Sequence, residues 1–107
     1  MKRFGQMIRL QPGVLESYKR YHAVIWPEVA AKIAECNIRN YSIYHKDGYL
    51  FAYFEYHGPD FAGDMAKMAE DQKTLEWWAI MKPMQAPLET RLPGEWWADM
   101  EECFHQD

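Results

Sequence analysis

Two strand-forming runs joined by a tight turn constrain the fold of this chain more than any other feature of its sequence. Residues 38–45 and 49–57 are rich in β-branched and aromatic side chains, which favour strands, and only residues 46–48 separate them. The Asp47-Gly48 pair in that gap is typical of a two-residue hairpin turn, in which both residues need a positive φ. The segment therefore predicts an antiparallel β-hairpin in which Lys46 pairs with Tyr49.

The predicted register places large apolar side chains on both faces of the hairpin. The expected cross-strand pairs are Tyr41 with Phe54 and Ile43 with Ala52 on one face, and Tyr44 with Phe51 and Ser42 with Tyr53 on the other. The helices of a chain of 107 residues can cover one of these faces, which leaves the second without cover. A second subunit is the economical cover, so the hairpin predicts a symmetric homodimer.

Periodicity and helix-breaking residues define the elements before the hairpin. Residues 3–10 alternate apolar and basic side chains, which predicts a strand. Apolar residues then recur at helical spacing from about residue 15. Pro27 interrupts this helix and starts a second one, because proline suits the first turn of a helix. Asn37 is the expected end of that second helix.

The elements after the hairpin complete a familiar order. Two helices are expected at about residues 60–69 and 71–82, followed by a proline-rich loop over residues 85–95 and a last strand at 99–105. The resulting order is strand, helix pair, two strands, helix pair, strand. This is the β-α-β-β-α-β order of an α+β, ferredoxin-like fold, in one domain spanning residues 1–107.

Composition and charge argue against several classes of partner. The formal net charge is −4, from 12 basic and 16 acidic residues, and the basic residues form no stripe or tail. Nucleic acid and anionic membranes are therefore not expected as partners. No uncharged stretch is long enough to span a membrane, and the N-terminus lacks the apolar core of a secretory signal. These features predict a cytoplasmic protein.

Cysteines, histidines and glycine loops give no sign of a metal or a cofactor. Cys36 and Cys103 lack metal-ligand spacing and are expected to be reduced and buried. The histidines, at positions 22, 45, 57 and 105, also lack the spacing of a metal site. No phosphate loop, dinucleotide fingerprint or nucleophile elbow is present, so neither metal nor cofactor is expected.

His22 is the first candidate for chemistry. It lies one helical turn after Tyr18 on the same face, and an imidazole can donate or accept a proton near neutral pH. The simpler interpretation is a partly buried helix histidine that bonds the backbone.

Aromatic residues supply the other candidates. Trp77 and Trp78 point about 100° apart on a helix, so one indole can enter the core while the other faces a cavity, where it would stack on the apolar face of a sugar. Tyr18 and Tyr41 each offer a ring and a hydroxyl that both donates and accepts. All four residues could equally be core residues, with the hydroxyls at a wet edge.

These residues together resemble the L-rhamnose mutarotase family. The stretch Tyr18-Lys-Arg-Tyr-His22-Ala-Val-Ile-Trp-Pro-Glu28 is similar to the family motif Tyr-x-x-x-His-x-x-Ile-Trp-Pro-Glu. Asn40-Tyr41-Ser42-Ile43-Tyr44 is similar to its second-strand motif, Trp77-Trp78 to its paired tryptophan, and residues 102–107 to its closing segment. The similarity covers nearly the whole chain, and the first motif is the specific one.

The resemblance implies a dimeric α+β barrel that interconverts the anomers of a 6-deoxy-hexose without a cofactor. It implies that His22 is the proton donor and that Tyr18, Tyr41, Trp77 and Trp78 bind the monosaccharide. The base is water or an unidentified carboxylate.

One segment departs from the family, and it leaves the substrate open. Residues 84–97 replace an Asn-Pro-Asp-Asn-Ser-Pro-like loop, so L-fucose is an alternative substrate to L-rhamnose. Trp96 and Trp97 in this segment are expected to anchor the loop on the fold or on a partner subunit. Two other functions remain open, a non-catalytic small-ligand binder and a cofactor-free monooxygenase on the same fold.

Overall fold

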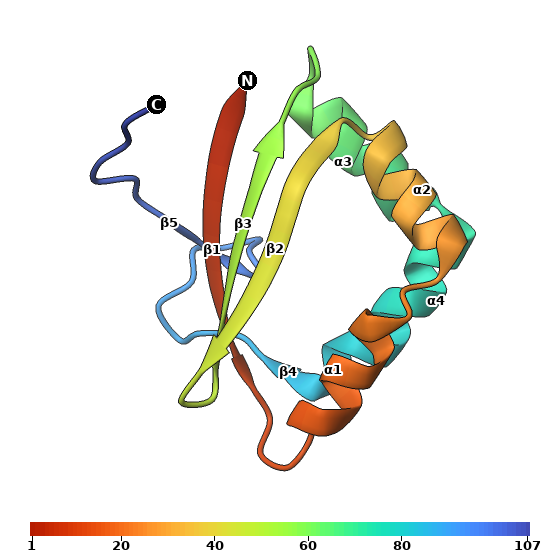
Figure 1. The fold of residues 1–107 in the computed structure, drawn as a ribbon, viewed down its shortest axis with the longest axis vertical. Helices are drawn as coiled ribbons and strands as arrows, with labels where there is room; N and C mark the ends of the chain where they lie inside the picture. The colour runs from red at the N-terminus through yellow and green to blue at the C-terminus, as the bar shows by residue number, and fades with distance from the viewer.

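The computed structural model of the protein describes all 107 residues and consists of a curved antiparallel sheet with helices on one face (Figure 1). The sheet order is β2-β3-β1-β4, and β5 also pairs with β1. The strands are β1 (Lys2–Leu10), β2 (Ile38–Lys46), β3 (Tyr49–Tyr56), β4 (Gln85–Ala86) and β5 (Ala98–Met100). The helices are α1 (Leu15–Ala23), α2 (Pro27–Glu35), α3 (Phe61–Glu70), α4 (Gln72–Met81) and the short 3-10 helix η1 (Lys82–Met84). This arrangement confirms the α+β, ferredoxin-like prediction.

The central hairpin forms as predicted at its turn. Asp47 and Gly48 have φ values of 53° and 81°, and Lys46 pairs with Tyr49. The observed pairs that match the prediction are Ser42 with Tyr53, Ile43 with Ala52 and Tyr44 with Phe51.

A β-bulge that the sequence analysis did not anticipate interrupts β2. The register shifts between Arg39 and Ser42, and Asn40 has a φ of 51°. Ile38 and Tyr41 are three residues apart, so in a regular strand they would lie on opposite faces. Both nevertheless pack on the helical side, where Ile38 is buried and the Tyr41 ring lies 5.5 Å from that of Phe54. The bulge therefore allows Ile38 to face the interior together with Tyr41.

The helix boundaries follow the expected breaking and capping residues. Trp26 is extended, with φ −60° and ψ 128°, and Pro27 opens α2. Asn37 follows α2 with a φ of 67°, a conformation that asparagine tolerates better than most residues. Asp60 caps α3 by accepting a hydrogen bond from the Gly63 amide, and Asp71 caps α4 in the same way through Thr74.

The core lies between the concave face of the sheet and the helices. Its larger cluster consists of Ile8, Leu10, Tyr18, Val29, Leu50, Trp77, Met81 and Met84. A smaller cluster lies toward α3 and consists of Ile38, Phe54 and Tyr56. The predicted inward parity of β1 is confirmed, since Ile8 and Leu10 are buried.

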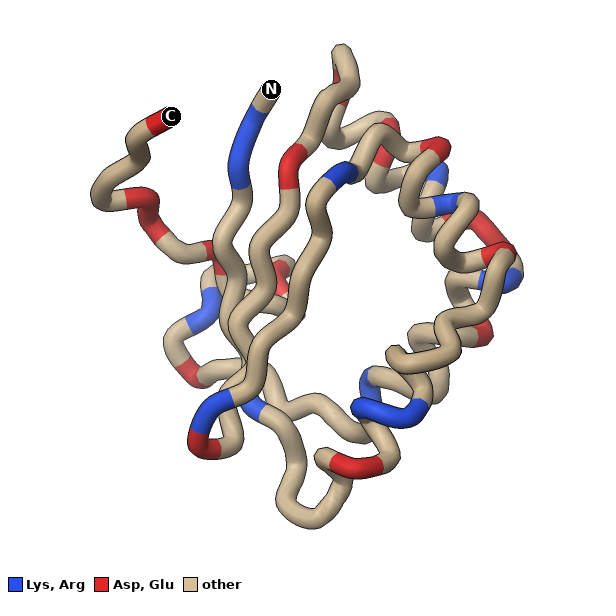
Figure 2. Tube along the Cα trace, viewed as in Figure 1, with Lys and Arg blue, Asp and Glu red and all other residues tan.

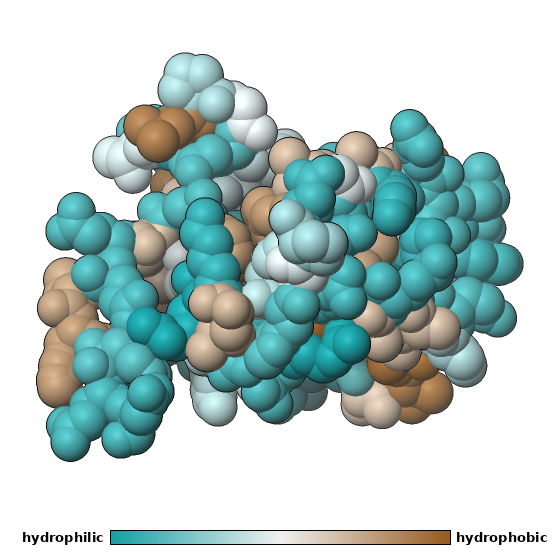
Figure 3. Space-filling model, turned by 90° about the horizontal axis from the view of Figure 1, so that it is seen from above, coloured by the Kyte–Doolittle hydropathy of each residue, from teal (hydrophilic) through white to brown (hydrophobic).

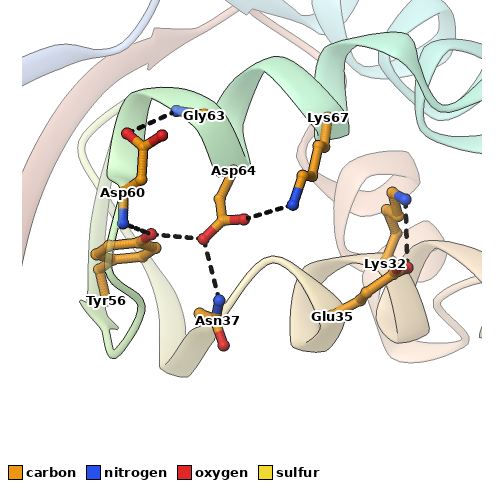
Figure 4. Close-up of polar contacts among 8 residues, drawn as sticks. All are labelled: Lys32, Glu35, Asn37, Tyr56, Asp60, Gly63, Asp64 and Lys67. Atoms are coloured by element: carbon orange, nitrogen blue, oxygen red, sulfur yellow. Dashed lines mark hydrogen bonds and ion pairs between the residues drawn. The ribbon is translucent and has the colours of Figure 1, made fainter.

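A buried carboxylate fastens α3 to the end of the hairpin (Figure 4). Asp64 accepts hydrogen bonds from the Tyr56 hydroxyl and from Asn37 Nδ2, the second at 3.0 Å, and its other oxygen lies 3.6 Å from Lys67 Nζ. These hydrogen bonds, that of Tyr56 first, hold the pKa of Asp64 below its ordinary value. The cluster joins α3 to the end of β3 and to the residue that precedes β2.

The C-terminal segment differs from its predicted form. β5 ends at Met100 instead of continuing to residue 105, and residues 101–107 are exposed and irregular. The backbone pairing of β5 with β1 stops at Met100. Beyond it, a side-chain ion pair connects the segment to β1, with Arg3 Nη2 2.9 Å from Glu102 Oε1. The expectation that both cysteines are buried was wrong for Cys103, because it lies in this unpaired segment, whereas Cys36 is buried. The predicted loop at 85–95 also begins with the two paired residues of β4.

Charges and apolar residues are spread over the surface. Lysine and arginine are interspersed with aspartate and glutamate, and β2 and β3 carry charges only toward their ends (Figure 2). Seen from above, most of the surface is hydrophilic and the hydrophobic residues form separate patches (Figure 3). None of the helices has the length and apolar character needed to cross a membrane.

Candidate active site

The five predicted site residues line one cavity of about 900 Å³ between the sheet and the helices. Tyr18 and His22 come from α1, Tyr41 from β2, and Trp77 and Trp78 from α4. The volume lies within the range of small-molecule sites, and most of its lining residues are hydrophobic. The fold therefore brings together side chains that are up to 60 residues apart in sequence.

His22 has one ring nitrogen held and one free. Its Nδ1 lies 2.7 Å from the backbone carbonyl oxygen of Tyr18. A carbonyl oxygen can only accept, so Nδ1 carries a proton and Nε2 is the nitrogen that can take up or release one. The imidazole stacks on the Tyr18 ring at a centroid distance of 4.3 Å, and the edge of Trp77 lies 5.4 Å away. These contacts fix the ring while leaving Nε2 without a protein partner.

Tyr18 is deeply buried yet hydrogen-bonded. Only 4% of its surface is exposed, and its hydroxyl oxygen accepts a hydrogen bond from Gln85 Nε2 at 3.1 Å. Burial raises the pKa of Tyr18, and the hydrogen bond from Gln85 partly offsets that rise. The hydroxyl therefore stays protonated at neutral pH.

Tyr41 lines the cavity without being packed within it. The residue is 43% exposed because it borders an open space. Burial of its hydroxyl nevertheless raises the pKa of Tyr41, and Tyr18 makes a smaller contribution to that rise. Both phenols line the same cavity. Both are neutral groups that can donate and accept hydrogen bonds.

The two adjacent tryptophans have different surroundings, as the helical turn between them predicts. Trp77 is 5% exposed and packs edge-on against Trp26 at 5.2 Å as well as against His22. Trp78 is half-buried, with Lys82 Nζ 5.5 Å from its ring centre. Trp77 is thus part of the core, and Trp78 is the more accessible indole.

The polar residues on the sheet side of the cavity were not predicted from the sequence. Gln6 Nε2 donates to Asp99 Oδ1 at 2.8 Å, and the two residues lie opposite each other on β1 and β5. Gln6 shares the inward parity of Ile8, so a polar residue in that alternation was the signal that could have identified it. Asp99 gave no such signal, because its orientation depends on the pairing of β5 with β1.

The divergent segment also contributes to the cavity. Gln85 is buried, and its Oε1 accepts a hydrogen bond from Trp96 Nε1 at 2.8 Å. Trp96 therefore anchors the loop on the fold, one of the two roles expected for it. No group of three or more His, Cys, Asp and Glu side chains is placed to hold a metal ion.

The sequence comparisons with known proteins agree with one another. The family model described as L-rhamnose mutarotase matches residues 3–106. The L-rhamnose mutarotase of Oceanobacillus iheyensis is 32% identical over 109 residues, and that of Lactiplantibacillus plantarum is 34% identical over 109 residues. In both cases the alignment covers 100% of each chain.

Solved structures confirm the fold class. The crystal structure of an L-rhamnose mutarotase from Formosa agariphila matches with a TM-score of 0.78 at 22% identity and covers 100% of both chains. Tetracenomycin F2 cyclase from Streptomyces glaucescens, a type-II polyketide cyclase, matches with a TM-score of 0.71 at 12% identity, covering 100% of this chain and 98% of that one. At these identities the likeness concerns the fold alone.

Proposed function

Because the chain belongs to the L-rhamnose mutarotase family, we propose that it is an isomerase that interconverts the α and β anomers of a 6-deoxy-hexose. The observation that carries the proposal is the shared cavity, in which a histidine with one free nitrogen lies beside two neutral phenols and two indoles. The family's relatives are named for L-rhamnose, which makes it the first substrate to test. L-Fucose is the second, because residues 84–97 differ from the family loop, and Gln85 and residues 94–97 of this segment line the cavity.

The proposed reaction moves protons and needs neither a metal nor a cofactor. Mutarotation requires a proton on the ring oxygen of the sugar and removal of a proton from its anomeric hydroxyl. The open-chain aldehyde then turns about the C1–C2 bond and closes on its other face. His22 donates the proton through Nε2, and general acid–base help of this kind is worth roughly 10²–10⁴-fold. The cavity offers two carboxylates, Glu95 and Asp99, besides water, for the complementary base.

The aromatic residues hold the sugar in this proposal. Trp77 and Trp78 present indole surfaces to the apolar face of the ring, while Tyr18 and Tyr41 bond its hydroxyls. A tyrosine hydroxyl already keeps its proton at neutral pH, and burial raises the pKa of Tyr18 and of Tyr41 further. They therefore remain able to donate as well as accept.

We place the protein in the cytoplasm as a homodimer. The face of the sheet turned away from the helices carries exposed apolar side chains, among them Tyr44, Tyr53 and Met100. A second copy packed on this face would cover them.

Exchange NMR against a panel of reducing sugars tests the function directly. Saturation of one anomeric proton transfers to the other at the rate of interconversion, so catalysis appears as faster transfer in the presence of protein. We expect acceleration with L-rhamnose or L-fucose and none after His22→Ala. Sugar binding without acceleration would instead identify a non-catalytic binder, and oxygen consumption with an aromatic substrate would identify a monooxygenase.

A further inference from the structure

A chain of three buried or partly buried side chains connects the divergent segment to the cavity. Gln85 lies on β4, opposite Leu10, and only 6% of its surface is exposed. Its amide lies between Trp96 and Tyr18, with Trp96 Nε1 2.8 Å from Oε1 and Nε2 3.1 Å from the Tyr18 hydroxyl oxygen. No buried side-chain polar atom in the protein lacks a hydrogen-bond partner, this amide included.

The chemistry of the indole fixes which way the Gln85 amide points. An indole N–H is a donor and never an acceptor, so the atom facing Trp96 must be the amide oxygen. The amide nitrogen is therefore the atom facing Tyr18, and it can only donate. Trp96 thus settles an orientation that two nearly isosteric amide ends would otherwise leave open.

The same logic extends to the proton of Tyr18. The hydroxyl oxygen already accepts from Gln85, so its single proton cannot point back along that bond. Tyr18 is packed in the core and also lines the cavity, which is the open space beside it. The proton is therefore directed into the space that the sugar would occupy.

We propose that Gln85 is a positioning residue that, oriented by Trp96, makes the Tyr18 hydroxyl a hydrogen-bond donor to an oxygen of the bound sugar. This inference rests on the proposed function, because it assigns a role within the same site. It places part of the substrate preference in the divergent segment, since a Tyr18 fixed as donor favours sugars that present an acceptor oxygen at that point. Oriented donors of this kind need no rearrangement when the substrate binds.

Gln85→Glu is the informative variant because it changes one amide nitrogen to oxygen and little else. Above its pKa the new carboxylate can only accept, so it keeps the bond from Trp96 and draws the Tyr18 proton away from the cavity. Below its pKa the neutral acid restores the wild-type pattern, because its carbonyl accepts from Trp96 and its O–H donates to Tyr18. The pH dependence therefore reports the direction of the proton.

The expected result is a loss of kcat/KM that reverses as the pH falls. At high pH Gln85→Glu should exchange the anomers about tenfold more slowly than wild type, the value of one lost hydrogen bond. The ratio of variant to wild type should rise toward one as the pH falls through the pKa of the new carboxyl. Taking the ratio removes any pH dependence that both proteins share.

Two further variants separate positioning from packing. Gln72→Glu makes the same chemical change on the exposed first residue of α4, and its ratio to wild type should be one at every pH. Gln85→Met keeps the length of the side chain but neither donates nor accepts through it, so its loss should be smaller than that of Gln85→Glu at high pH and independent of pH. The proposal is overturned if the ratio of Gln85→Glu to wild type does not change with pH. It is also overturned if Gln85→Met loses as much kcat/KM as Gln85→Glu does at high pH.

A readout without substrate keeps this inference separate from the proposed function. Tyrosine labelled with ¹³C at Cζ reports the hydrogen bonding of each hydroxyl, and Tyr18→Phe assigns the resonance of Tyr18. In Gln85→Glu that resonance should titrate with the new carboxyl, and in wild type it should not titrate over the same range. If wild type accelerates no sugar, the proposed function fails, but a Tyr18 resonance that titrates in Gln85→Glu still supports the role of Gln85 in orienting the Tyr18 proton. A resonance that does not titrate overturns that role even in an active enzyme.

Discussion

His22 owes its proposed role to the atoms that hold its ring. Because Nδ1 is bonded to the Tyr18 carbonyl at 2.7 Å, the imidazole has one fixed tautomer when neutral, and Nε2 is left as the free nitrogen of a residue that lines the cavity. The simpler interpretation of the sequence, a helix histidine bonded to backbone, is thus correct for one nitrogen and compatible with catalysis at the other. The two interpretations describe different ends of the same ring.

His22→Ala should abolish most of the anomer exchange while leaving the fold intact. We expect a loss of roughly 10²-fold or more from the missing acid. The half-buried imidazole should cost only about 1 kcal/mol of unfolding free energy on truncation. Exchange NMR and thermal melts measure the two effects, and His105→Ala in the irregular C-terminal segment is the matched control. Exchange at the wild-type rate in His22→Ala would contradict the assignment.

Trp77→Ala and Trp78→Ala should fail in different ways. Trp77 is buried among Trp26, His22 and the core, so its truncation should cost about 3–5 kcal/mol of stability. Trp78 is half-buried beside Lys82, so its truncation should mainly weaken sugar binding. Thermal melts together with sugar titrations distinguish the two outcomes. If both variants lose activity only in proportion to lost folded protein, neither indole serves the sugar.

At the scale of elements, the hairpin shows what its sequence could and could not predict. The Asp47-Gly48 turn fixed the register outward from the tip, and the pairing was correct as far as Ser42 and Tyr53. It was wrong beyond that point, because the bulge at Asn40 pairs Arg39 with Glu55 instead of Tyr56. Turn chemistry is local and readable, whereas a bulge depends on how both ends of a strand pack at once.

The bulge provides a test of how β2 positions Tyr41. Asn40 has a φ of 51° and donates to Glu55 Oε1 at 2.8 Å, so Asn40→Val should strain the backbone by roughly 1–3 kcal/mol and displace Tyr41. Asn40→Gly also loses the hydrogen bond but accepts the positive φ. We expect Asn40→Val to lower both the melting temperature and the exchange rate, and Asn40→Gly to retain the exchange rate. A retained rate in Asn40→Val would show that the bulge does not position Tyr41.

The attachment of α3 to the hairpin should weaken in acid. Hydrogen bonds from Tyr56 and Asn37 lower the pKa of Asp64, so its carboxylate contributes stability that is present above the unfolded-state pKa. That contribution is lost as the pH falls below about 4, through the lowered pKa of the folded state. Melting temperatures measured against pH should therefore fall less steeply in Asp64→Asn than in wild type. Asp47→Asn in the exposed turn is the control, and a slope for Asp64→Asn equal to that of wild type would contradict this account.

At the scale of the whole molecule, element order was enough to predict the fold but not the contents of the cavity. Alternation in β1, the hairpin turn and the proline breaks gave the β-α-β-β-α-β order before any contact was known. The cavity also contains Gln6, Asp99, Gln85 and Trp96, whose positions depend on the pairing of β4 and β5 with β1. Those pairings join residues about 75 to 95 positions apart, and short-range patterns carry little information about them.

The whole molecule is expected to be a homodimer. Light scattering at micromolar concentration should give twice the chain mass of 12.8 kDa. The reason is the outer face of the sheet, where Tyr44 is 68% exposed, because a lone protomer would leave this apolar surface in water. Tyr44→Glu should shift the mass toward the monomer, since the partner would then have to bury a charge.

The control for the dimer places the same charge on the other layer of the molecule. Leu75 is an exposed apolar residue of α4, so Leu75→Glu makes a comparable change on the helical side and should leave the dimer intact. Circular dichroism of both variants tests whether each protomer keeps its fold. A clean 12.8 kDa monomer in wild type would refute the dimer, and dissociation by both variants would show that the interface is not confined to the outer face.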